Sequence, residues 1–121
     1  MAELMPKSVI WIGDSLEVLR DFPPPVRDEI GFALFLAQVG SKHVAAKPLK
    51  GFGPGVLEVL SDHRGDTFRT VYTVRFATAI YVLHAFQKRS KTGIAAPARE
   101  LELVKARLKL AEGLHRKREK H

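Results

Sequence analysis

The chain has 121 residues, a formal net charge of +7, and 45% hydrophobic and 27% charged residues, values typical of one globular domain. It has no cysteine, which excludes disulfide and thiolate chemistry, and no stretch approaches the roughly 18 consecutive apolar residues that a membrane-spanning helix needs. The beginning of the sequence shows no signal-peptide pattern, so we expect a cytoplasmic protein with a single domain over residues 1–121 and a basic C-terminal tail at about 113–121.

The positive charge lies in the second two-thirds of the chain. Residues 1–41 carry three basic and six acidic side chains, residues 42–92 carry nine and three, and residues 93–121 carry eight and four. This asymmetry favours a polyanion such as RNA or DNA, an acidic protein, or both as partners. Charge alone is also compatible with a basic protein that binds neither.

Turn residues and hydrophobic periodicity predict seven elements. Asp14 and Ser15 supply N-cap residues for a first helix, and the prolines at 23–25 end it. Gly40 suits a left-handed cap at the end of a second helix, and residues 41–55, with three lysines, two prolines and three glycines, are predicted to form a loop. In chain order the elements are a strand at 9–12, a helix at 15–20, a helix at 26–39, strands at 56–60, 68–76 and 79–88, and a helix that begins at Pro97.

The order of these elements is β-α-α-β-β-β-α, which predicts an α+β domain. The last three strands follow one another through short connections, so they are expected to form an antiparallel meander. We expect the helices to pack on one face of this sheet and the other face to be free for a ligand.

The last two strands are predicted to place polar side chains on that free face. If Ala77 and Thr78 form a two-residue turn, Arg69 lies opposite Phe86 and His84 lies one residue pair further along. A connection with an odd number of residues would destroy this grouping, because neighbouring side chains alternate faces. The predicted polar set is Arg69, Thr73, Arg75, His84, Phe86 and Lys88, and the predicted core set is Phe68, Tyr72, Val74, Tyr81 and Leu83.

The polar set suits the handling of RNA. An aromatic ring such as Phe86 can stack on a base, and arginine and lysine can pair with phosphates. For cleavage, His84 can act as base or acid, Arg69 can stabilise the phosphorane, and one of several cations after the last strand can protonate the leaving oxygen. These cations are Lys88, Arg89 and Lys91. The histidines and carboxylates show no ligand spacing, so we predict no metal and no cofactor.

Each of these residues also has a structural alternative. His84 can be a hydrogen-bonded structural histidine, and Phe86 can cover the edge of the core. Arg69 can pair with Glu58 across the sheet, provided that the preceding turn aligns Asp62 with Thr67. The cations after the last strand can be a solvated strand end, and the role of Lys47 and Lys50 on the glycine-rich loop is left open, because the segment GFGPG is too short to identify a nucleotide-binding loop.

Three segments carry a resemblance to a known family: KPLKGFGPGVLEV, DTFRTVYTV and YVLHAFQKRSKTG. From about residue 8 to residue 112, the sequence resembles the phage-derived toxin-like family within the RelE/HigB/ParE superfamily of bacterial toxin–antitoxin systems. The resemblance implies a RelE-like fold and an endoribonuclease that cleaves mRNA in the ribosomal decoding site without a metal. It also implies a cognate helix-turn-helix antitoxin that binds and blocks the toxin.

The resemblance implies roles for individual residues. Arg69 matches the catalytic, phosphate-binding arginine of the third strand, and either Lys88 or Arg89 matches the basic residue after the fourth strand. No tyrosine follows Tyr81, so the C-terminal tyrosine of RelE has no counterpart, or its role has passed to His84. The predicted catalytic residues are Arg69, His84 and Lys88, and the predicted RNA-binding residues are Lys47, Lys50, Arg75, Phe86, Arg89 and Lys91. Two alternatives stay open: a ParE-like toxin that inhibits gyrase without cleaving RNA, and a phage or prophage accessory protein that binds nucleic acid.

Overall fold

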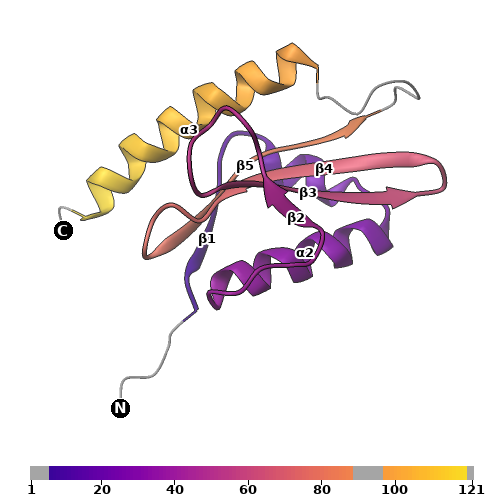
Figure 1. The fold of residues 1–121 in the computed structure, drawn as a ribbon, viewed down its shortest axis with the longest axis horizontal. Helices are drawn as coiled ribbons and strands as arrows, with labels where there is room; N and C mark the ends of the chain where they lie inside the picture. The colour runs from indigo at the N-terminus through magenta and orange to yellow at the C-terminus, as the bar shows by residue number, and fades with distance from the viewer. Residues whose placement is uncertain (1–5, 89–96, 120–121) are drawn as a thin grey trace.

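Five strands form a single sheet in the order β1-β5-β4-β3-β2 (Figure 1). The structure is a computed structural model that describes residues 6–88 and 97–119. Strand β1 is parallel to β5, and each other pair of neighbouring strands is antiparallel. In chain order the elements are β1 (Ser8–Trp11), α1 (Ser15–Arg20), α2 (Pro24–Gln38), β2 (Ala46–Pro48), β3 (Val56–His63), β4 (Asp66–Thr73), β5 (Ala79–Lys88) and α3 (Ala98–Glu119).

The sheet buries apolar side chains on both of its faces. Helices α1 and α2 cover one face, where Leu34 belongs to the same core cluster as Val59 and Ile80. Helix α3 covers part of the other face, which we call the α3 face, and there Leu108 clusters with Tyr81 (Figure 1). The predicted α+β class and antiparallel meander are confirmed, and the arrangement is compatible with a RelE-like fold. The expectation that all helices share one face was wrong, because α3 lies on the face that was expected to stay open.

A β-bulge explains why that face can accept a helix. The pairing between β4 and β5 shifts by one residue between Val71 and Tyr72. The observed partners are Arg69 with Phe86, Val71 with His84, Tyr72 with Val82 and Thr73 with Tyr81. The shift turns Tyr81 and Leu83 toward α3, where they supply the apolar surface that the helix needs, so their predicted place beside Tyr72 was wrong.

The connection between β4 and β5 is longer than the predicted two-residue turn. Strand β4 ends at Thr73 and β5 begins at Ala79, so the connection is residues 74–78 rather than a two-residue turn. With this connection alone, Arg69 and His84 would lie on different faces. Because the bulge shifts the pairing by one further residue, the predicted grouping of Arg69, His84 and Phe86 is nevertheless confirmed.

Two local predictions near the helices have different outcomes. Gly40 caps α2 as expected, with φ of 82° and a hydrogen bond of 2.7 Å from the Ser41 N–H to the Leu36 carbonyl oxygen. Asp14 precedes α1 but makes no side-chain capping hydrogen bond, so that prediction was wrong; its carboxylate accepts a hydrogen bond from Arg107 of α3 instead.

The loop predicted at 41–55 contains a short strand. Residues Ala46–Pro48 form β2, which pairs with β3 at the edge of the sheet. Pro48 is tolerated there because an edge strand leaves backbone N–H groups without a ladder partner in any case. None of the helices in the described part of the chain has the length and apolar content that crossing a bilayer requires.

Candidate functional site

Arg69 lies on the α3 face in the middle of β4 and is almost completely buried. Its Nη1 donates a hydrogen bond of 3.1 Å to Oε2 of Glu58, on the neighbouring strand β3. Only 6% of the Arg69 side chain and 11% of the Glu58 side chain are exposed. Asp62 is paired with Thr67, so the condition for this ion pair is met, and the structural alternative for Arg69 is confirmed as a contact. The guanidinium and the carboxylate neutralise each other in an apolar setting.

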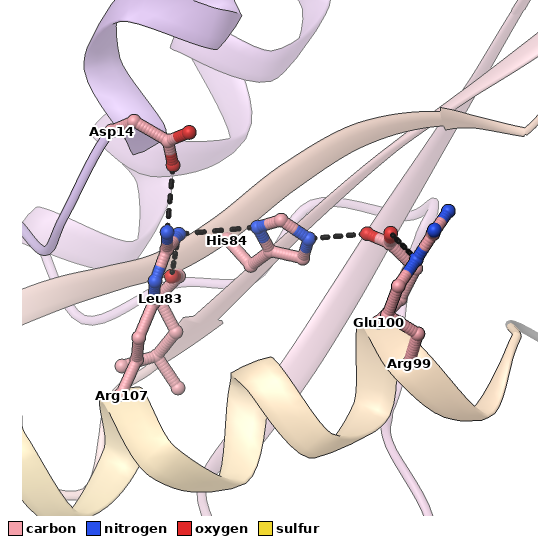
Figure 2. A network of polar contacts seen from close by, with 6 residues as sticks. All are labelled: Asp14, Leu83, His84, Arg99, Glu100 and Arg107. Atoms are coloured by element: carbon pink, nitrogen blue, oxygen red, sulfur yellow. Dashed lines mark hydrogen bonds and ion pairs between the residues drawn. The ribbon is translucent and has the colours of Figure 1, made fainter.

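His84 is buried on the same face, and α3 engages both nitrogens of its ring (Figure 2). Nε2 contacts the carboxylate of Glu100, and Nδ1 lies 3.1 Å from Nη1 of Arg107. A guanidinium can only donate hydrogen bonds, so Nδ1 must accept and must therefore be unprotonated. Nε2 then carries the proton and donates a hydrogen bond to the Glu100 carboxylate. The contacts fix the ring orientation and the tautomer of His84.

Arg107 connects His84 to the loop before α1. Besides the ring of His84, it donates to the Leu83 carbonyl oxygen at 3.0 Å and to Oδ1 of Asp14 at 2.7 Å (Figure 2). The Arg107 guanidinium holds the pKa of the Asp14 carboxyl below its usual value of 3.8. Gly13 lies directly against the guanidinium: its φ is +58°, and a Cβ there would be 2.8 Å from Arg107. A glycine therefore suits both the backbone conformation and the close approach.

The aromatic ring beside this network is Phe86. It stacks on the His84 ring with 5.2 Å between ring centroids and an interplanar angle of 22°, and it lies opposite Arg69 in the sheet. Phe86 is partly exposed, so it has one face on the histidine and accessible surface beyond it. Lys88 ends β5 opposite Thr67, which places its backbone two residues beyond Phe86, towards the same end of the sheet as the pair of Arg69 and Phe86. Arg89 and Lys91 lie outside the described residues.

The other predicted RNA-binding residues lie in two different places. Lys47 lies on β2 rather than on a loop, directly opposite Glu58, so it is an exposed cation on the α3 face. Lys50 is exposed in the turn that follows β2. Arg75 lies beyond the end of β4 and does not join Arg69. Its guanidinium donates to the carbonyl oxygens of Phe52 at 2.7 Å and Pro54 at 3.2 Å, so it holds the glycine-rich loop in place.

Neither tyrosine of the chain can serve the α3 face near Arg69 and His84. Tyr72 points to the α2 side of the sheet, where burial raises its pKa to about 12. The hydroxyl of Tyr81 hydrogen-bonds with Nδ1 of His115 at 3.0 Å, and burial raises its pKa as well. The described residues contain no group of three or more histidines, aspartates and glutamates that could hold a metal ion.

Comparison with known proteins assigns this chain to a family. The family model described as "Phage derived protein Gp49-like (DUF891)" matches residues 17–109, well over half of the chain. The chain belongs to the phage-derived Gp49-like family. No curated protein and no solved structure gives a significant match.

The Gp49-like match covers most of the residues of the site that sequence reasoning missed. Glu100 and Arg107 lie inside the matched segment, whereas Asp14 precedes it. The spacing of Glu100 and Arg107 indicates that both lie on the same side of α3, because residues seven apart on a helix share a side. What the sequence could not show is which strand that side would cover, because the position of α3 depends on the bulge in β5.

Proposed function

We propose that this protein is the toxin of a type II toxin–antitoxin system and cleaves mRNA on the ribosome. The observation that carries the proposal is the grouping of Arg69, His84 and Phe86 at adjacent positions of one sheet face. Membership of the Gp49-like family, a fold compatible with RelE-like toxins and the net charge of +7 support it. On this account the superfamily of the chain is RelE/HigB/ParE, its location is the cytoplasm, and its substrate is ribosome-bound mRNA.

The chemistry proposed is attack of the 2′-oxygen of RNA on the adjacent phosphorus, with departure of the 5′-oxygen. His84 takes the 2′-hydroxyl proton on Nδ1, which requires Arg107 to release that nitrogen. Glu100 then stabilises the imidazolium through Nε2, as a carboxylate does for the histidine of a catalytic triad. Arg69 faces the charge that builds on the phosphorane, and Lys88 protonates the leaving oxygen.

Binding of RNA must also open the surroundings of Arg69, because the residue is only 5% exposed and its Nη1 donates to Glu58. The guanidinium carries five N–H donors, so a phosphate can share it with the carboxylate. Lys47 is the exposed cation closest to this pair in the sheet register, and we assign it to the RNA backbone together with Lys50. Phe86 positions a base by stacking on its accessible side.

The burial of Arg69 and His84 favours a second candidate function. Their residue exposures are 5% and 6%, and both form internal ion pairs or hydrogen bonds. A purely structural role explains these contacts as well: the Arg69–Glu58 pair joins β4 to β3, and the contacts of His84 join β5 to α3. The second candidate is therefore a toxin of the same fold that inhibits gyrase by binding and cleaves nothing. In both cases the proposed regulator is a cognate helix-turn-helix antitoxin.

Primer extension on an mRNA in a cell-free bacterial translation reaction tests the proposal. The purified protein is expected to create new 5′ ends only when ribosomes are present. Lys47→Ala is expected to reduce cleavage and to weaken its dependence on salt, whereas Arg27→Ala, which removes an exposed cation from α2, is expected to leave cleavage unchanged. Intact mRNA under these conditions would contradict the proposal and make gyrase inhibition the next assay.

A further inference from the structure

A groove on the α3 face of the sheet lies between α3 and the loop that connects β2 to β3 (Figure 1). We call it the loop groove. Its volume is about 310 Å³, at the lower end of the range for small-molecule sites. Phe52 belongs to the loop wall, and Leu101 and Leu108 form the apolar part of the helix wall. The polar side chains of the groove come from α3, and the proposed mechanism uses none of them.

The loop groove adjoins the residues that are proposed to act on RNA. Phe52 packs against the apolar cluster that contains Val71. In the sheet, Val71 is paired with Glu58 on one side and with His84 on the other. The helix wall begins directly after Glu100, whose carboxylate contacts His84. One end of the groove therefore borders the proposed site, and a nucleotide next to the cleaved bond can enter it.

The walls of the loop groove are apolar and tied to each other. Phe52 and Leu101 are both partly exposed and line the groove from opposite sides. Arg75 holds the loop through its hydrogen bonds to two loop carbonyl oxygens. Its Nη1 also lies 3.5 Å from Oε1 of Glu112, and this ion pair joins the loop to α3. Two apolar walls held in this way suit a flat ring such as a nucleobase, which stacks on an aromatic side chain.

One carboxylate in the loop groove is available to a ligand. Glu112 is paired with Arg75, whereas the Glu102 side chain forms no ion pair with any other residue that the structure describes. A carboxylate can only accept hydrogen bonds, and guanine presents two neighbouring donors, N1–H and N2–H, on its Watson–Crick edge. Adenine has an acceptor at N1, which a carboxylate repels. Glu102 therefore favours guanine over adenine.

Two lysines of α3 bring positive charge to the same groove. Lys105 and Lys109 lie one helical turn apart, line the groove and are exposed. Within residues 6–88 and 97–119, neither of them forms an ion pair. Ammonium groups in this position can bind the phosphate of a nucleotide whose base lies between the apolar walls. The groove thus offers a complementary group for each part of a guanine nucleotide.

We propose that the loop groove selects guanine in the RNA substrate. Phe52 stacks on the base, Glu102 accepts hydrogen bonds from its Watson–Crick edge, and the two lysines bind its phosphate. The inference rests on the proposed function, because it assigns base selection to RNA that is held at Arg69 and His84. It predicts that mRNA is cut next to guanine.

Nucleotide binding in the absence of ribosomes tests the loop groove directly. In amide NMR spectra of the full chain, 5′-GMP is expected to shift the signals of Phe52 and Glu102 and to bind about tenfold more tightly than 5′-AMP. Glu102→Gln is expected to bring the two dissociation constants within about twofold of each other, because an amide has both a donor and an acceptor and suits adenine as well. Glu29→Gln, which changes an exposed carboxylate on α2, is expected to keep the preference. Equal binding of the two nucleotides, or no shift of these signals at about 10 mM GMP, would overturn the proposal.

Mapping of the cleaved sites separates this proposal from the proposed function. In the translation reaction, the cuts made by the wild type are expected to be enriched next to guanine. Glu102→Gln is expected to lose this enrichment, and Glu29→Gln is expected to keep it. Cleavage by the wild type without guanine enrichment would overturn base selection by the groove and leave the proposed endonuclease standing. A preference for GMP together with intact mRNA would instead overturn the proposed cleavage and leave the nucleotide site standing.

Discussion

Replacing Arg69 with methionine is expected to destabilise the protein by about 3–5 kcal/mol, because Glu58 would remain as a buried charge without a partner. The magnitude follows from the geometry of the pair. At the observed 3.1 Å and an effective dielectric constant of about 20, the attraction is about 5 kcal/mol. With side-chain exposures of only 6% and 11%, solvent screens little of it. The cost of removing both charges from water offsets most of this attraction.

The double variant Arg69→Met with Glu58→Leu is therefore expected to lie within about 1 kcal/mol of the wild-type stability, because it removes both charges and retains most of the volume. Urea denaturation of the wild type, both single variants and the double variant gives the coupling energy of the pair. A loss of less than about 1 kcal/mol in Arg69→Met alone, or a double variant as unstable as that single variant, would show that Glu58 does not need this partner.

Three further predictions concern the network around Arg107. Gly13→Ala is expected to lose at least about 1 kcal/mol more than Gly40→Ala in thermal unfolding, because both glycines have positive φ but only Gly13 lies against the guanidinium, and equal losses would contradict this. The contribution of Asp14 to stability is present above its unfolded pKa of 3.8 and is lost as pH falls through its lower folded pKa. A carboxyl NMR titration should therefore give a midpoint below 3.8 in the folded protein, and Arg107→Met should raise it; a midpoint at or above 3.8 would rule out the ion pair. Nitrogen NMR of the His84 ring is expected to show the proton on Nε2 and a bare Nδ1, and the opposite tautomer would mean that the arginine contact is not made in solution.

The elements of the fold could be predicted because their signals are local. The prolines at 23–25 and the glycine after α2 mark helix boundaries. Both β5 and α3 have strong periodic patterns of apolar residues. Strand β2 (Ala46–Pro48) was missed because three residues, one of them a lysine and one a proline, show no alternation of apolar and polar side chains. Only their pairing with β3 makes them a strand. Long-range pairing of this kind leaves no trace in a short window.

The candidate site was predictable only in part. The pairing of Arg69 with Phe86 was found from an assumed two-residue turn, and it holds because a longer turn and a bulge compensate each other. The contacts of Glu100 and Arg107 with His84 depend on α3 crossing the sheet at that point. Such a contact depends on the tertiary position of a helix, and a sequence pattern shows only which side of the helix is polar.

The double variant also provides the most direct test of Arg69 in catalysis, because it should retain the fold while it lacks the guanidinium. Primer extension in the translation reaction is expected to show ribosome-dependent mRNA cleavage with the wild-type protein and intact mRNA with Arg69→Met, Glu58→Leu. Arg27→Ala serves as the matched control, since it removes an exposed cation from α2, retains the Arg69–Glu58 pair and is expected to cut. Cleavage by the folded double variant at the wild-type rate would contradict the assignment of Arg69, and intact mRNA with the wild type would contradict the proposed activity itself.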